Sequence, residues 1–148
     1  LAPKTKIHPG LRLSQLNVCE QNSNAANLWG PGISLYFDRW LHLDVSAFAD
    51  FQAQNFGADT VQAVVAADTY SDYFGRGQRK WGNPYIGGGI GWIRHKNADH
   101  LVVAINLGVE IFKSERILLD LSLRTSALLL GGMPRAALEP GLGLNVAF

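Results

Sequence analysis

The sequence predicts an all-β protein: a single domain over residues 1–148 that folds as an eight-stranded, antiparallel, up-and-down β-barrel and crosses a membrane with its strands. Three observations predict this fold. Apolar residues recur at every second position, which is the side-chain period of a β-strand. Most predicted strands are about ten or more residues long, enough to cross a bilayer when tilted, whereas strands of soluble proteins usually have about five or six. Charged residues are only 17% of the chain and glycines number 16, a composition typical of a surface that does not face water.

Eight segments show the alternation of a strand, and few windows show the three-and-four spacing of a helix. The predicted strands are Gly10–Asn17, Gly32–Phe37, Trp40–Gln52, Thr60–Tyr73, Asn83–Arg94, His100–Phe112, Arg116–Leu130 and Arg135–Phe148. No segment reaches the roughly 18 to 20 consecutive apolar residues that a membrane-spanning helix needs. The chain can therefore span only as a closed barrel, because open sheet edges leave backbone groups unpaired in lipid.

The third and sixth strands alternate most clearly. In the third, Leu41, Leu43 and Val45 share one face and are interleaved with polar residues that begin at His42. In the sixth, every odd position from Leu101 to Ile111 is apolar. We expect the apolar faces to point outward to lipid and the other faces to point into the barrel. The same register predicts an inward Phe112.

The last strand gives the first resemblance to a known family. Leu142, Leu144, Val146 and Phe148 lie on one face of a strand that ends in an aromatic residue. This pattern resembles the closing strand of bacterial outer-membrane β-barrels, which the barrel-insertion machinery reads. The resemblance implies that these four residues are an insertion signal and that the insertion machinery is a partner.

The fifth strand and the following hairpin strengthen this resemblance. The run Asn83-Pro84-Tyr85-Ile86-Gly87-Gly88-Gly89-Ile90-Gly91-Trp92 resembles the fifth strand of the opacity-type and OmpA-like eight-stranded barrels. The segment from Leu107 to Arg124 is similar to the penultimate hairpin of that family. The resemblance implies a location in the bacterial outer membrane, in contact with its lipid and lipopolysaccharide.

The links between strands predict the orientation of such a barrel. Asp38-Arg39 and Lys113–Glu115 are tight links at one end, which we expect to face the periplasm, and the Asn-rich Val18–Trp29 is a longer, extracellular loop. The link Phe74–Gly82 is long for a periplasmic turn. It carries Arg76, Arg79 and Lys80, which we expect to contact another envelope protein.

The inward faces carry a set of charged residues. It consists of Arg12, Asp44, Glu110, Asp120, Arg124 and Glu139. An eight-stranded barrel is only wide enough for side chains to fill it. We therefore expect Arg12 and Arg124 to be neutralised by the four acids, rather than to line an open channel.

The composition and motifs favour a non-enzymatic structural or interaction component, which could be a subunit of a larger complex. The net charge of +1 offers no field for nucleic acid, and we expect no catalytic residue, cofactor or metal. The single Cys19 is expected in a loop, and the four histidines are expected to be solvated. Two alternatives remain: a lipid-modifying enzyme of the lipid A deacylase or acyltransferase type, and, less favoured because the inward face is predicted to be polar, a lipocalin-like ligand-binding barrel.

Overall fold

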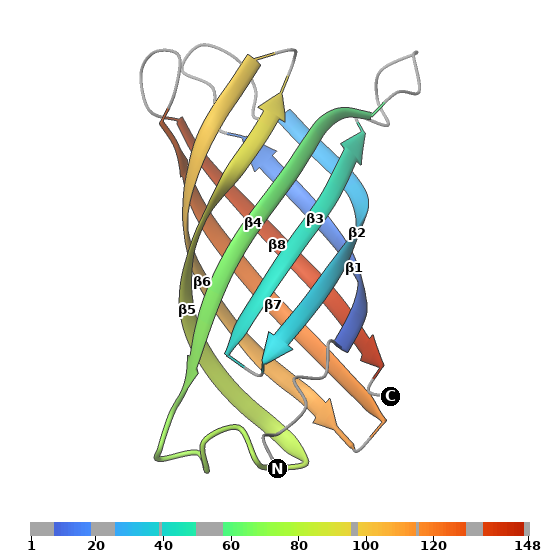
Figure 1. The fold of residues 1–148 in the computed structure, drawn as a ribbon, viewed down its shortest axis with the longest axis vertical. Helices are drawn as coiled ribbons and strands as arrows, with labels where there is room; N and C mark the ends of the chain where they lie inside the picture. The colour runs from blue at the N-terminus through green and yellow to red at the C-terminus, as the bar shows by residue number, and fades with distance from the viewer. Residues whose placement is uncertain are drawn as a thin grey trace.

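The protein is a closed barrel of eight antiparallel strands joined in sequence order (Figure 1). The computed structural model describes residues 8–18, 26–38, 40–49, 58–95, 98–114, 116–129 and 135–146. The strands are β1 (His8–Val18), β2 (Ala26–Asp38), β3 (Leu41–Ala49), β4 (Ala58–Tyr70), β5 (Trp81–His95), β6 (Ala98–Lys113), β7 (Ile117–Leu128) and β8 (Arg135–Val146). Pairing of β1 with β8 closes the barrel. The predicted fold class is confirmed.

Each strand rises from one end of the barrel and the next one returns. We name the end at which β1 begins and β8 ends the terminal end; it also carries the β2–β3, β4–β5 and β6–β7 links. The other end is the opposite end. Within the described residues, no helix is long and apolar enough to span a membrane.

Strand β2 begins earlier than the sequence predicted. It starts at Ala26 rather than at Gly32, so Gly30 and Pro31 lie inside the strand. A side chain at Gly30 would overlap the backbone oxygen of Ala47 in β3. Glycine is therefore required by the close approach of two backbones, and it does not mark the end of the strand.

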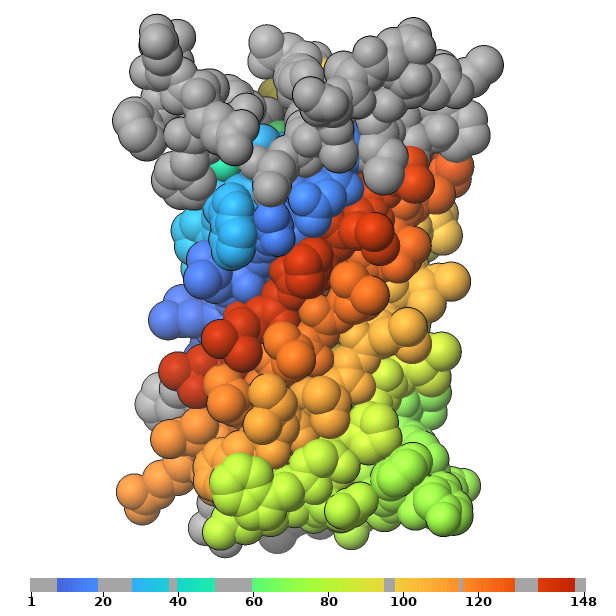
Figure 2. Space-filling model, turned by 180° about the vertical axis from the view of Figure 1, so that it is seen from behind, coloured from blue at the N-terminus to red at the C-terminus, as the bar shows by residue number. Residues whose placement is uncertain are grey.

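The two faces of the barrel differ in the way that the alternation predicted. Outward side chains such as Leu11, Ile90 and Ile105 are 68%, 65% and 57% exposed. Their inward neighbours in sequence, including Arg12 and Asn106, are buried. Figure 2 shows one outer face, over β1, β8, β7 and β6. The apolar side chains thus coat the outside, the reverse of a water-soluble barrel.

The prediction that Phe112 points into the barrel is wrong. Glu110 pairs with Asp120, but Phe112 pairs with Leu119, so a bulge at residue 111 shifts the register. The Phe112 ring packs against the exposed Trp81 ring, with 4.8 Å between the centroids. A bulge adds one residue to one strand and changes which face the following side chain takes.

Candidate functional site: a divided barrel interior

The polar section of the interior is centred on Arg124 of β7, which is 1% exposed. Its guanidinium forms ion pairs with Asp44 of β3 and, at 3.4 Å, with Glu139 of β8. Its Nε donates to Asn106 Oδ1 at 2.9 Å. Asn106 and Glu139 are the direct partners of Arg124 on the two neighbouring strands, so strand register places these groups. Asp44 reaches Arg124 from a distant strand.

His42 of β3 extends this network to β4. Its Nδ1 lies 3.2 Å from Asp44 Oδ1 and its Nε2 lies 2.8 Å from Asp68 Oδ2. The ring also stacks on Tyr36, with centroids 4.8 Å apart. His42 and His100 are 3% and 8% exposed, so the expectation of solvated histidines is wrong for both. The alternation had already placed His42 on the inward face, which was the available signal.

A second group of polar contacts lies nearer the terminal end. Arg12 donates to Ser122 Oγ at 2.5 Å and to Ser14 Oγ at 3.2 Å. The Tyr85 hydroxyl lies 2.8 and 2.9 Å from the two Asp120 oxygens. Lys113 Nζ lies 3.9 Å from Glu110 Oε2.

The structure thus distributes the six predicted cluster residues over four sets of contacts. Asp44 and Glu139 meet Arg124, whereas the contacts of Arg12 are serine hydroxyls, Asp120 accepts from a tyrosine, and Glu110 lies near a lysine. Sequence reasoning missed tyrosine, histidine and serine as partners of the buried charges. Their inward positions follow from the same alternation that placed the charges.

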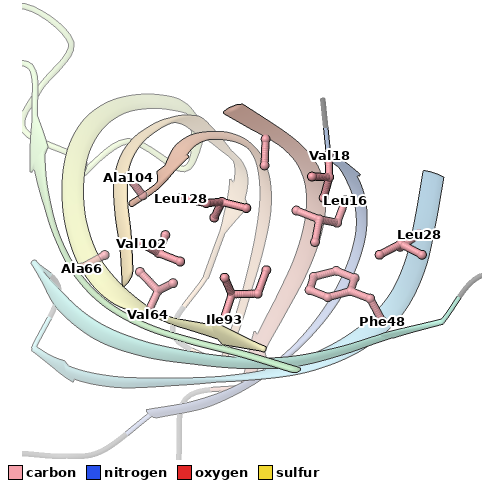
Figure 3. Close-up of a cluster of buried hydrophobic side chains, with 11 residues drawn as sticks. Leu16, Val18, Leu28, Phe48, Val64, Ala66, Ile93, Val102, Ala104 and Leu128 are labelled. Atoms are coloured by element: carbon pink, nitrogen blue, oxygen red, sulfur yellow. The ribbon is translucent and has the colours of Figure 1, made fainter. Parts of the chain in front are cut away.

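The apolar section of the interior lies towards the opposite end. Eleven buried side chains from all eight strands form it: Leu16, Val18, Leu28, Phe48, Val64, Ala66, Ile93, Val102, Ala104, Leu128 and Ala137. The labelled side chains in Figure 3 point into the space that the strands enclose. Most of these residues lie within three residues of the end of their strands on that side of the barrel. Buried Thr60, opposite Phe48, and buried His100, opposite Ile93, add polar groups at this end. The inward face there is therefore mostly apolar, whereas the sequence predicted a polar inward face.

The β4–β5 link folds over the mouth of the barrel at the terminal end. Gly77 is buried, and a side chain there would lie 2.5 Å from the ring of Tyr70, an inward residue of β4. Asn83, which is buried and inward, holds Arg79 through two hydrogen bonds. Lys113 Nζ donates to the Gly77 carbonyl at 2.8 Å. The long link is therefore fastened to the interior at three points.

The remaining predicted residues lie in different places. Leu142 and Leu144 are outward and exposed. The side chain of Val146, and Phe148 and Cys19 altogether, lie outside the described residues. Arg76, Arg79 and Lys80 are all exposed on the β4–β5 link.

The hydrogen bonds of the buried serine and histidine side chains show whether they could form a catalytic site. The Ser34 hydroxyl donates to Asp44 at 2.7 Å, and both nitrogens of His42 face carboxylates. A serine nucleophile needs a hydrogen bond to its base, and Ser34 is directed to an acid instead. In the part of the chain that the structure describes, no three histidine, cysteine or acidic residues are grouped to hold a metal ion.

Solved structures supply the comparison that decides the fold. The chain superposes on the crystal structure of Neisserial surface protein A with a TM-score of 0.66 and 16% identity, over 96% of this chain and 97% of that one. It superposes on the N-terminal β-barrel domain of Pseudomonas aeruginosa OprF with a TM-score of 0.56 and 14% identity, over 93% and 96%. The fold is that of a small outer-membrane β-barrel.

The likeness is one of fold alone. No protein-family model matches the sequence, and no curated protein matches it. The resemblance to eight-stranded outer-membrane barrels that the fifth strand, the penultimate hairpin and the final strand predicted is confirmed at this level. The role of the barrel must be argued from its own surfaces.

Proposed function

We propose that this barrel is an integral protein of the bacterial outer membrane that acts through its surfaces, as a non-enzymatic structural or interaction component. The observation that supports a membrane location is the outward face. Exposed leucine, isoleucine and valine side chains cover the barrel on strands β1 to β8. In water, such a continuous apolar surface would drive association.

The interior supports a role that does not involve transport. Buried side chains from every strand fill it, with the ion pairs around Arg124 in one section and a mostly apolar cluster in the other. The β4–β5 link covers the terminal end. An ion that entered from either side would have to cross an apolar section or displace a fastened link.

The proposed orientation places the terminal end in the periplasm. In that orientation the lipid-facing band contacts outer-membrane lipid and lipopolysaccharide. The outward Leu142 and Leu144, continued in sequence by Val146 and Phe148, are the proposed signal for the barrel-insertion machinery. The exposed Arg76, Arg79 and Lys80 are the proposed contact with another envelope protein.

A single pair of substitutions tests the membrane location. Ile105 is 57% exposed on the outer face of β6. In a bilayer, Ile105→Arg should destabilise the barrel by about 2–4 kcal/mol, since a charge near the midplane is costly. Gln78→Arg, at an exposed position of the β4–β5 link, is the matched control and should change stability little.

The measurement is urea unfolding of the protein folded into phospholipid vesicles, with membrane retention and heat-modifiable gel migration of the unmodified chain as the parallel observation. In a water-soluble barrel, Ile105→Arg would be as harmless as the control. That result, or a chain that stays in solution without detergent, would overturn the proposal.

The absence of transport is tested with the unmodified chain in planar bilayers. We expect no steady conductance from barrels that show heat-modifiable migration. Stable single-channel currents would contradict a role confined to surfaces.

A further inference from the structure

The β4–β5 link has properties that a simple connection between strands does not need. It runs over residues 71–80, whereas one turn residue is described between β2 and β3 and the β6–β7 link covers 114–116. In Figure 2 it lies along the lower rim of the barrel. Small barrels of this architecture have short turns at the periplasmic end, so the extra length needs an explanation.

The link is held in a strained and defined conformation. Gly75, Arg76 and Gly77 have φ values of 76°, 53° and 73°. A left-handed backbone is costly for a residue such as arginine and persists only where the surroundings impose it. The surroundings here are the two Asn83–Arg79 hydrogen bonds, the Lys113 bond to the Gly77 carbonyl, and the Tyr70 ring beneath Gly77.

The outer side of the link presents cations and aromatic rings to solvent. Tyr73 is 90% exposed and stacks edge-on against Phe74. The link carries three cations and one acid, and that acid, Asp72, pairs with Arg76 at 2.5 Å. Among the described residues, no carboxylate forms an ion pair with Arg79 or Lys80. Arg116 of the neighbouring link is also exposed.

We propose that the β4–β5 link is a preorganised docking surface for an acidic segment of a partner protein at the periplasmic end. The inference rests on the proposed function, which places this end in the periplasm. Tyrosine and arginine are the residues that most often anchor protein interfaces. A loop already held in its bound conformation loses less entropy on binding, which accounts for the strain and the three attachments.

The position of the link favours a protein segment over lipid headgroups. Gly77 and Arg79 are fastened to inward residues, Tyr70 and Asn83, so this part of the link lies across the mouth of the barrel. A headgroup site would adjoin the apolar band on the outer wall instead. Arg79 and Lys80, which form no ion pair with a carboxylate of the described residues, select an acidic segment among possible protein partners.

The experiment measures binding of a fluorescein-labelled octaglutamate peptide to the full chain in phosphatidylcholine nanodiscs, by fluorescence anisotropy at about 0.15 M salt, where the Debye length is about 8 Å. The double variant Arg79→Glu with Lys80→Glu should weaken binding about tenfold or more. The matched control is Arg94→Glu with Arg135→Glu, which changes the net charge equally at the opposite end. It should leave the affinity within about twofold, because those sites lie farther from the link than a Debye length.

Preorganisation is tested separately without changing any charge. Asn83→Ala removes both bonds to Arg79 and should weaken peptide binding several-fold. Gly75→Ala, which strains the same left-handed link, is the second variant if Asn83→Ala does not give a heat-modifiable barrel. Unchanged affinity for the peptide in the folded variant would overturn the proposal of a preorganised docking surface.

Other outcomes also decide the matter. Equal losses in the double variant and its control would show diffuse attraction and overturn the proposal. Absence of peptide binding would also overturn the proposal. In that case, native mass spectrometry that shows phosphatidylglycerol retained through Arg79 and Lys80 would assign the link to lipid headgroups. Heat-modifiable migration is recorded for every sample, so a failure of the barrel itself is distinguished from a failure of the docking surface.

Discussion

The two sections of the interior solve the same packing problem with different chemistry. Around Arg124, buried groups make directional contacts that join β3, β4, β6, β7 and β8. Around Phe48 and Leu128, most buried groups are apolar and have to fill volume. The polar section therefore depends on particular partners, and the apolar section depends on shape. This difference predicts how each section responds to substitution.

The largest effect is expected from removal of the central cation. Arg124→Met leaves Asp44 and Glu139 buried without their ion-pair partner and should lower the free energy of unfolding by about 3–5 kcal/mol. Urea unfolding in phospholipid vesicles measures this effect. In the triple variant that also carries Asp44→Asn and Glu139→Gln, much of the loss should be recovered. If the single and triple variants are equally unstable, the ion pairs of Arg124 are not what makes the polar section sensitive to substitution.

The apolar section should respond to lost volume. Leu128 is 2% exposed within the cluster, and Leu128→Ala should cost about 2–5 kcal/mol through lost burial and the cavity left behind. The neighbouring Leu129 is 43% exposed, so Leu129→Ala is the control and should cost clearly less. The same unfolding assay compares the two variants. Equal costs would mean that the cluster is not closely packed.

An intermediate effect is expected at the contact between Tyr85 and Asp120. Tyr85→Phe removes the hydroxyl that lies 2.8 Å from the buried carboxyl of Asp120 while keeping the ring. The loss should be about 1.5–3 kcal/mol, the usual worth of a hydrogen bond to a charged group. Vesicle unfolding of Tyr85→Phe, read against Tyr73→Phe at a 90% exposed ring, isolates the contribution of burial. A difference near zero would remove this contact from the network.

The smallest effect is expected at the edge of the polar section. Ser34 donates to Asp44, which also accepts from Arg124 and lies beside His42. Ser34→Ala should therefore cost only about 1 kcal/mol. Combined with Arg124→Met, its effect should be non-additive, because both residues contact the same carboxylate. Strict additivity in a double-mutant cycle would contradict a coupled network.

Sequence reasoning succeeded where a rule depends on the neighbouring residues alone. Alternation in β3 and β6 placed Asp44 inward and Ile105 outward, because the side-chain period of a strand is two. It failed at Phe112, where a bulge inserts one residue, and at Gly30 and Pro31, which lie within β2 although the predicted strand began at Gly32. In both places the backbone of an adjacent strand sets the geometry.

The candidate site divides in the same way. Alternation predicted that six charged residues face inward, yet it could not say that Arg12 meets serine hydroxyls while Arg124 meets two acids. Asp44 and Ser122 lie far along the chain from the arginines that they contact, and their heights in the barrel follow from strand tilt and register. The link over residues 71–80 was visible as an unusually long, basic turn. Its attachment to Asn83, Lys113 and Tyr70 was not.

The sequence by itself determined that this protein has long antiparallel strands with an outward apolar side and an enclosed side that carries charges, because the side-chain period of two depends only on neighbouring residues. Only the tertiary structure decided that the enclosed side has a section of ion pairs and a mostly apolar section, that His42 is buried between two acids, and that one link is fastened over the mouth. The physical reason is closure: when β1 pairs with β8, every inward side chain acquires neighbours from across the barrel that no stretch of sequence contains.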